Sequence, residues 1–96
     1  MDPAIPDIKI SDVVVSTKGR DQGNWFYVIA EDPVFVFLAN GKDRTLDKPK
    51  RKKRKHVQKV LRSETRVAEK LRHGDKVLNG ELRRDLAFLA RETTSE

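Results

Sequence analysis

Three short apolar runs, rich in β-branched and aromatic residues, stand out in the first forty positions. They cover residues 13–15, 24–30 and 34–39. Such side chains favour strands because they pack well on a pleated surface. Polar segments that contain glycine, proline or aspartate separate the runs, and no long helical periodicity lies between them. The first half of the chain therefore predicts an antiparallel sheet or a small barrel.

The connections between these runs are marked by turn residues. Asn40-Gly41 follows the third run and predicts a type I′ hairpin, which needs positive φ at both central residues. We expect residues 42–46 to form the returning strand. Residues 57–61 are a short apolar run of ambiguous type, either a fifth strand or the start of a helix. Three glycines are assigned to turns: Gly19, Gly23 and Gly41.

The aromatic cluster Trp25-Phe26-Tyr27 lies inside the second predicted strand. Strand alternation places Phe26 on the face opposite to Trp25 and Tyr27. Aromatic side chains can stack on unpaired bases. A chain with so few aromatic residues needs most of them inside, however, so we favour core packing for this cluster.

The last third of the chain changes to a helical period. Ser63 is a plausible N-cap for a first helix, and Gly74 ends it. A second helix is expected from Asn79 or Gly80. Its apolar residues recur at intervals of four and three, which makes one stripe that docks on the sheet or on a partner. The stripe consists of Leu82, Leu86 and Leu89.

These patterns together predict a mainly β fold with a C-terminal α-helical part. We divide the chain into an N-terminal extension, residues 1–9, a β domain, residues 10–61, and a helical tail, residues 62–96. A single small domain of 96 residues has little room for both a core and a deep, water-excluding pocket.

Charge separates the two halves of the chain. The net charge is +6, but residues 1–47 hold 5 Lys/Arg and 8 Asp/Glu (5 − 8 = −3), whereas residues 48–96 hold 16 and 7 (16 − 7 = +9). Residues 48–56 form a basic run with seven Lys/Arg and no acidic residue. Its self-repulsion disfavours packing unless counter-charge is present. The run predicts contact with a polyanion, with nucleic acid favoured over an anionic membrane surface. It also fits a nuclear-localisation signal, if the source is eukaryotic.

Several functional classes are disfavoured by what the sequence lacks. It has no cysteine, and its two histidines, His56 and His73, have no metal-ligand spacing, so we predict no metal and no cofactor. No phosphate-cradling loop or nucleophile motif is present, and we predict no enzymatic activity. The acidic start does not resemble a signal peptide, and no run approaches the roughly 20 apolar residues of a membrane span. We expect a soluble, cytoplasmic protein without membrane contact, monomeric when free.

Residues 12–29 resemble a KOW motif. The motif consists of an apolar strand, a glycine-containing loop and a second apolar strand, here residues 13–15, a loop with Gly19 and Gly23, and residues 26–29. The following Asn40-Gly41 and the lysine-rich run are similar to one branch of KOW proteins. That branch is the archaeal and eukaryotic large-subunit ribosomal protein fourteen family, with its small bacterial relatives. In the wider motif a further glycine often follows the central one, but Trp25 and Phe26 stand there in this chain.

The resemblance implies a five-stranded SH3-like barrel closed by residues 57–61, RNA binding, and a role in translation or ribosome assembly. We therefore expect RNA, most naturally ribosomal RNA, as the partner, together with ribosomal or transcription-factor proteins. The alternative hypothesis is a protein-interaction module whose SH3-like barrel or leucine-striped helix binds a transcription or translation factor. The residues predicted to contact RNA are Lys18, Arg20, Lys48, Lys50, Arg51, Lys52, Lys53, Arg54, Lys55 and His56.

Overall fold

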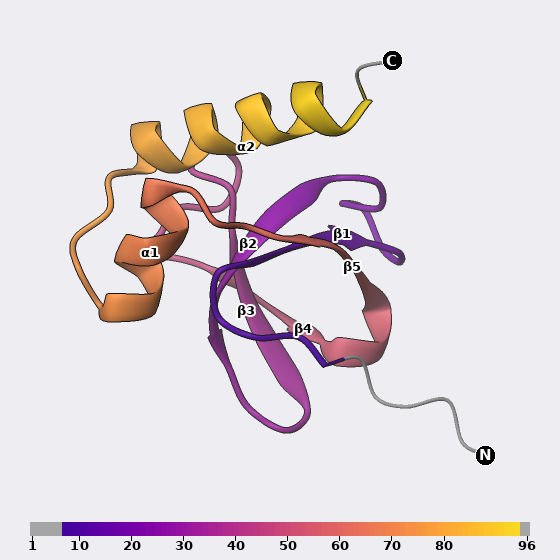
Figure 1. The fold of residues 1–96 in the computed structure, drawn as a ribbon. Coiled ribbons are helices and arrows are strands. Elements are labelled where there is room, and N and C mark those ends of the chain that lie inside the picture. The colour runs from indigo at the N-terminus through magenta and orange to yellow at the C-terminus, as the bar shows by residue number, and fades with distance from the viewer. Residues whose placement is uncertain (1–6, 95–96) are drawn as a thin grey trace.

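The computed structural model describes residues 7–94, so residues 1–6 of the predicted extension and the last two residues of the predicted tail lie outside it. The fold is mainly β with two C-terminal helices, which confirms the predicted order of elements (Figure 1). The strands are β1 (Asp12–Ser16), β2 (Trp25–Glu31), β3 (Phe35–Ala39), β4 (Lys50–Lys53) and β5 (Val57–Arg62). A 3₁₀ turn, η1 (Arg54–His56), joins β4 to β5, and α1 (Arg66–His73) and α2 (Asn79–Thr94) follow.

The five strands form one antiparallel sheet in the order β4-β3-β2-β1-β5. The sheet is open, since β4 and β5 are its two edges among the described residues. Residues 57–61, which the sequence left ambiguous, belong to β5 and pair with β1 from Val57 opposite Ser16 to Arg62 opposite Asp12. A strand therefore follows the basic run directly, and the helices begin only after it.

The predicted hairpin after β3 is wrong. Residues 42–46 form no strand, and the chain returns to the sheet only at β4. Gly41 has a φ of 78°, but Ser11 is the one non-glycine residue with positive φ in the described chain, so Asn40 lacks the conformation that a type I′ turn requires. The side-chain oxygen of Asn40 instead accepts hydrogen bonds from the amides of Lys42 and Arg44, both at 3.0 Å. The result is a wider loop that is held by its own first residue.

Contact with α2 explains why this segment is a loop. The amide of Leu46 donates to the side-chain oxygen of Asn79 at 2.8 Å, so this backbone donor is used by the helix rather than by a neighbouring strand. A Cβ atom at Gly41 would lie 2.2 Å from the backbone oxygen of Asn79. Only glycine permits this close approach, and α2 therefore fixes the course of the chain between β3 and β4.

The sheet buries side chains on both faces. One face holds an apolar cluster that contains Phe26, and it is made up of Ile8, Val14, Phe26, Val28, Val36, Leu38 and Val57. The other face packs against the helices through Val13, Tyr27, Ala39, Val67, Ala68, Leu82 and Leu86, with Trp25 partly buried beside them. Phe26 therefore lies opposite to Trp25 and Tyr27, and Phe26 and Tyr27 are core residues, as the alternation predicted.

The helices cover the face that contains Tyr27. Leu82 and Leu86 are buried there and Leu89 is partly buried, which confirms that the leucine stripe docks on the sheet. Figure 1 shows α1 and α2 at one side of the molecule and η1 at the other. No helix within residues 7–94 combines the length and the apolar character that crossing a membrane requires.

The start of α1 differs from the prediction, whereas its end is confirmed. Thr65, rather than Ser63, is the N-cap, and its hydroxyl accepts from the amide of Ala68 at 3.2 Å. Ser63 is buried and accepts a hydrogen bond from the Tyr27 hydroxyl at 2.8 Å. Gly74, with a φ of 75°, ends the helix.

Candidate nucleic-acid interface

The basic run forms the edge strand β4 and the 3₁₀ turn η1. Residue pairing across β3 places Lys52 opposite the buried Val36 and Lys53 opposite the half-buried Phe35. Successive cations of the run therefore alternate between the interior and the surface. We call Lys50, Lys52 and Arg54 the inward row, and Arg51, Lys53 and Lys55 the outward row.

Lys52 is used inside the fold. Its side chain is only 8% exposed, and its ammonium group lies 2.6 Å from a carboxylate oxygen of Asp21 and 2.6 Å from the backbone oxygen of Lys18. These contacts bind β4 to the loop between β1 and β2. The Asp21 carboxylate also accepts from the hydroxyl of Ser16 at 2.8 Å. Asp21 thus supplies the counter-charge that lets a lysine-rich segment form a strand.

The electrostatics of Asp21 reflect this pairing. Burial alone would raise the pKa of Asp21, but the hydrogen bonds from Lys52 and Ser16, with the charges of Lys52 and Lys50, outweigh burial and lower it below its usual value. The second carboxylate oxygen of Asp21 is buried without a hydrogen-bond partner, and the ammonium group of Lys50 lies 3.8 Å from it. The carboxylate therefore stays ionised, with one oxygen incompletely satisfied.

Arg54 is the second buried cation of the run. Its guanidinium group pairs with Glu31 and donates to the backbone oxygens of Ile8 at 2.9 Å and Asp32 at 2.8 Å. These three partners lie just before β1 and around the turn between β2 and β3. Arg54 therefore holds several segments together, and its charge is compensated within the protein.

A groove of about 420 Å³ opens beside β4. We call it the basic groove, and it is lined by Lys18, Gly19, Phe35, Lys50, Arg51, Lys52, Lys53 and His56. Lys18 and Lys53 are exposed, and neither forms an ion pair within residues 7–94. The guanidinium carbon of Arg51 lies 4.5 Å from the centre of the Phe35 ring, so a cation–π contact joins these two residues of the groove lining. The groove therefore offers uncompensated positive charge from two segments far apart in the sequence.

His56 lies in the same groove. Partial burial, followed by repulsion from the charges of Lys18 and Lys55, lowers the pKa of His56 below its usual value. Without a ligand the imidazole is therefore less readily protonated than a free histidine. An anion in the groove would offset the lysine charges and favour protonation.

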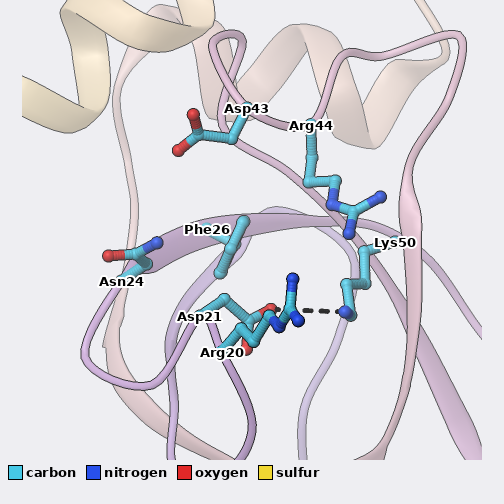
Figure 2. A pocket seen from close by; sticks show the side chains of 7 residues that line it. All are labelled: Arg20, Asp21, Asn24, Phe26, Asp43, Arg44 and Lys50. Atoms are coloured by element: carbon cyan, nitrogen blue, oxygen red, sulfur yellow. Dashed lines mark ion pairs between the residues drawn. The ribbon is translucent and has the colours of Figure 1, made fainter.

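A smaller hollow of about 290 Å³ adjoins Lys50 (Figure 2). We call it the loop pocket. Its lining comes from the β1–β2 loop, from β2, from the β3–β4 loop and from β4, and it consists of Arg20, Asp21, Asn24, Phe26, Asp43, Arg44 and Lys50. Lys50 lines both hollows, so the loop pocket and the basic groove are adjacent.

The residues predicted to contact RNA are divided among the basic groove, the loop pocket and positions outside both. The groove gathers Lys18 with most of the run, and the pocket gathers Arg20 with Lys50. Lys48 and Lys55 are exposed but line neither hollow, and Arg54 is buried. The three predicted turn glycines, Gly19, Gly23 and Gly41, have φ values of 93°, 91° and 78°.

Sequence reasoning missed Asn24, Asp43 and Arg44. The last two fall in residues 42–46, which we had assigned to a strand. That stretch contains one apolar residue in five and no alternation, and its polarity was the available signal for an exposed loop.

Comparison with known proteins assigns no relative: no family model matches the chain, and no curated protein matches it. Within residues 7–94, no group of three or more His, Asp or Glu side chains is placed to hold a metal ion.

Proposed function

We propose that this chain is a non-catalytic RNA-binding protein whose basic groove neutralises RNA phosphates. The observation that carries the proposal is the gathering of Lys18, Lys53 and His56 in one groove, with no acidic partner for the two lysines in the described chain. Cations that replace the counterions of phosphates supply most of the sequence-independent affinity for nucleic acid. The groove therefore suits a polyanionic backbone.

The resemblance to KOW proteins supports RNA as this polyanion. The sheet is open, but its edge strands β4 and β5 are joined by the three residues of η1, and this short connection supports the further proposal of an SH3-like barrel. On this basis we propose a cytoplasmic role in translation or ribosome assembly, with ribosomal RNA as the target. Phosphate contacts position a protein on RNA without identifying bases, so the groove alone does not select a sequence.

Protection of the sheet edge is a simpler reason for lysines in β4. Charged side chains on an edge strand prevent pairing with another chain. Edge protection explains the outward row, but it does not explain Lys18 and His56, which lie outside β4 and also line the groove. Phosphate binding explains the outward row and these two residues together.

The alternative hypothesis, a protein-interaction module, named the barrel and the leucine stripe as possible binding surfaces, and the leucine stripe is not available. Leu82 and Leu86 are buried against the sheet of the same chain, so the leucine stripe is already covered. A partner would have to use another face.

The proposal is tested by titrating a fluorescent single-stranded RNA with protein at increasing salt. The test variant carries Lys18→Gln, Arg51→Gln and Lys53→Gln, all at exposed positions. Loss of three phosphate contacts should flatten the log–log salt dependence by about 2, at roughly 0.7 per contact on single strands. Lys52 and Arg54 are left intact because their loss would disturb the fold.

The matched control carries Arg66→Gln, Lys76→Gln and Arg91→Gln, which are exposed, lie in or between the helices and remove the same charge. We expect its salt dependence to stay close to that of the wild type. Equal flattening in both triple variants would show that net charge, rather than the groove, drives binding. Absence of salt-sensitive RNA binding by the wild-type protein would refute the proposal.

A further inference from the structure

The loop pocket combines exposed side chains of both charges. Arg20 and Arg44 form no ion pair and no side-chain hydrogen bond within residues 7–94, and neither does the carboxylate of Asp43. Figure 2 shows Asp43 and Arg44, although adjacent in sequence, pointing away from each other around the pocket. The pocket is therefore lined by two arginines and a carboxylate that have no ion-pair partner within residues 7–94.

These charged groups favour a ligand that carries both an anionic group and hydrogen-bond donors. Unpaired guanidinium groups favour an anion, and arginine matches phosphate geometry especially well. An ionised carboxylate only accepts hydrogen bonds, so Asp43 favours a ligand that brings donors. Asp21 also lines the pocket, but its second carboxylate oxygen is buried 3.8 Å from the ammonium group of Lys50, so it adds negative charge rather than an exposed acceptor. A phosphate alone would meet the cations but be repelled by the carboxylates.

A nucleotide with an unpaired base has both properties. Its phosphate suits the arginines, and the edge of its base carries N–H donors. A volume of about 290 Å³ lies at the small end of ligand pockets, which fits one nucleotide rather than a larger molecule. Phe26, a core residue that is 1% exposed, forms part of the pocket wall, and the exposed Asn24 adds a side chain that both donates and accepts. Recognition of splayed-out bases by their edges is the usual route to sequence preference on single-stranded RNA.

We propose that the loop pocket binds one unpaired base of the RNA strand whose phosphates follow the basic groove, and that Asp43 makes it prefer guanine. The inference rests on the proposed RNA binding and deepens it. Guanine carries a ring N–H and an exocyclic amino group side by side, so it presents two donors to the two oxygens of a carboxylate. Uracil has no amino group. Lys50, which lines both hollows, connects the base site to the phosphate path.

The test compares RNAs that differ by one amino group. The probes are uridine oligomers of about eight nucleotides, with a central guanosine, a central inosine or no substitution. Inosine keeps the ring N–H of guanosine but lacks the exocyclic amino group. We expect the wild-type protein to bind the guanosine oligomer roughly fivefold more tightly than the inosine oligomer, and the all-uridine oligomer most weakly.

Asp43→Asn should remove this preference, because an amide places a donor where the base needs an acceptor. Its salt dependence should match the wild type, since Asp43 contacts no phosphate. The control is Asp75→Asn, which makes the same change at an exposed position between α1 and α2 and should keep the preference. Asp43 is exposed, so neither variant is expected to disturb folding.

Two results would overturn the inference while leaving the proposed function intact. One is equal, salt-sensitive binding of all three oligomers by the wild type, and the other is a guanosine preference that survives Asp43→Asn. Failure of the wild type to bind any oligomer in a salt-sensitive way would instead refute the proposed function, and the base site with it.

Discussion

The helix-covered face and the basic groove are built in opposite ways. On the helix-covered face every strong interaction is completed inside the protein: Leu82 and Leu86 are buried, and the hydroxyl of Tyr27 is hydrogen-bonded to Ser63 and Asp85. In the groove, Lys18 and Lys53 remain exposed without an acidic partner in the described chain. The first region is a finished structural unit, whereas the second keeps charge available for a ligand.

Lys52 and Arg54 of the inward row are also paired inside the protein, although they belong to the basic run, whereas Lys50 is half-buried and lines both hollows. Lys52 and Arg54 are as necessary to the fold as apolar residues, because each bridges segments distant in the chain. A run of like charges is therefore not one functional unit. Its alternate residues serve stability and binding separately, and variants of each kind distinguish the two roles.

Lys52→Met should have the largest effect on stability. The change removes the ion pair between Lys52 and the nearly buried Asp21, which connects the β1–β2 loop to β4. Breaking such a buried pair costs about 3–5 kcal/mol. Chemical denaturation measures this loss. In the wild type the lowered pKa of Asp21 gives stability that is present above its unfolded value and lost as the pH falls through its folded value, and this acid sensitivity should shrink in the variant. An unchanged denaturation midpoint would contradict the structural role of the inward row.

Leu86→Ala should cost about 2–5 kcal/mol, because Leu86 is buried between α2 and the sheet. The thermal melting midpoint reports the loss, and the salt dependence of RNA binding should stay unchanged under conditions where the variant is folded. A melting midpoint equal to the wild type would show that α2 does not need its leucine stripe for docking.

Tyr27→Phe should cost about 1–3 kcal/mol, because the change removes one buried hydrogen-bond partner from both Ser63 and Asp85, although each keeps its hydrogen bond to Thr65. Burial, followed by the hydrogen bond to Asp85 and the charge of Asp85, raises the pKa of the Tyr27 hydroxyl well above its usual value. We therefore expect the tyrosine of the folded wild type to resist ionisation in an alkaline spectroscopic titration. Ionisation near the ordinary tyrosine pKa while the protein is still folded would contradict the buried network.

His56 should give the smallest effect, a severalfold change in RNA affinity with pH. Burial and the nearby lysines lower its pKa in the free protein, and a bound phosphate would raise it. Binding then takes up a proton, so affinity is greatest below the free pKa and falls as the pH rises through the bound pKa. Titrations at about pH 5.5 and about pH 8 at constant ionic strength measure this, and His56→Gln should remove the dependence. Equal pH dependence in the variant would place the titrating group elsewhere.

The local sequence pattern predicted those strands whose own residues favour β structure. The β-branched and aromatic runs predicted β1, β2 and β3, and the leucine spacing predicted α2 and its docking. β4 was missed because lysine and arginine are not strand formers, and this strand depends on Asp21, which lies 31 residues away. Asn40-Gly41 failed as a hairpin signal because α2 holds the following loop.

The candidate site, like the fold, was predicted only in part. Lys18 and the basic run were identified from charge alone, and the structure brings them to one groove. Sequence could not separate the inward row from the outward row, since that division depends on pairing with β3 and on the partners Asp21 and Glu31. Nor could the sequence predict that Asn24 and Arg44 line one pocket, since this depends on two loops lying close together beside Lys50.

Mapping RNA onto the folded protein by backbone amide shifts in NMR tests the central claim most directly. Addition of a single-stranded RNA should shift the amides of Lys18, Gly19, Lys53 and His56, which line the basic groove, and leave those of Ala87 and Arg91 on the outer side of α2 in place. Shifts concentrated on α2, with the groove amides unmoved, would contradict the assignment of the groove as the RNA-binding surface.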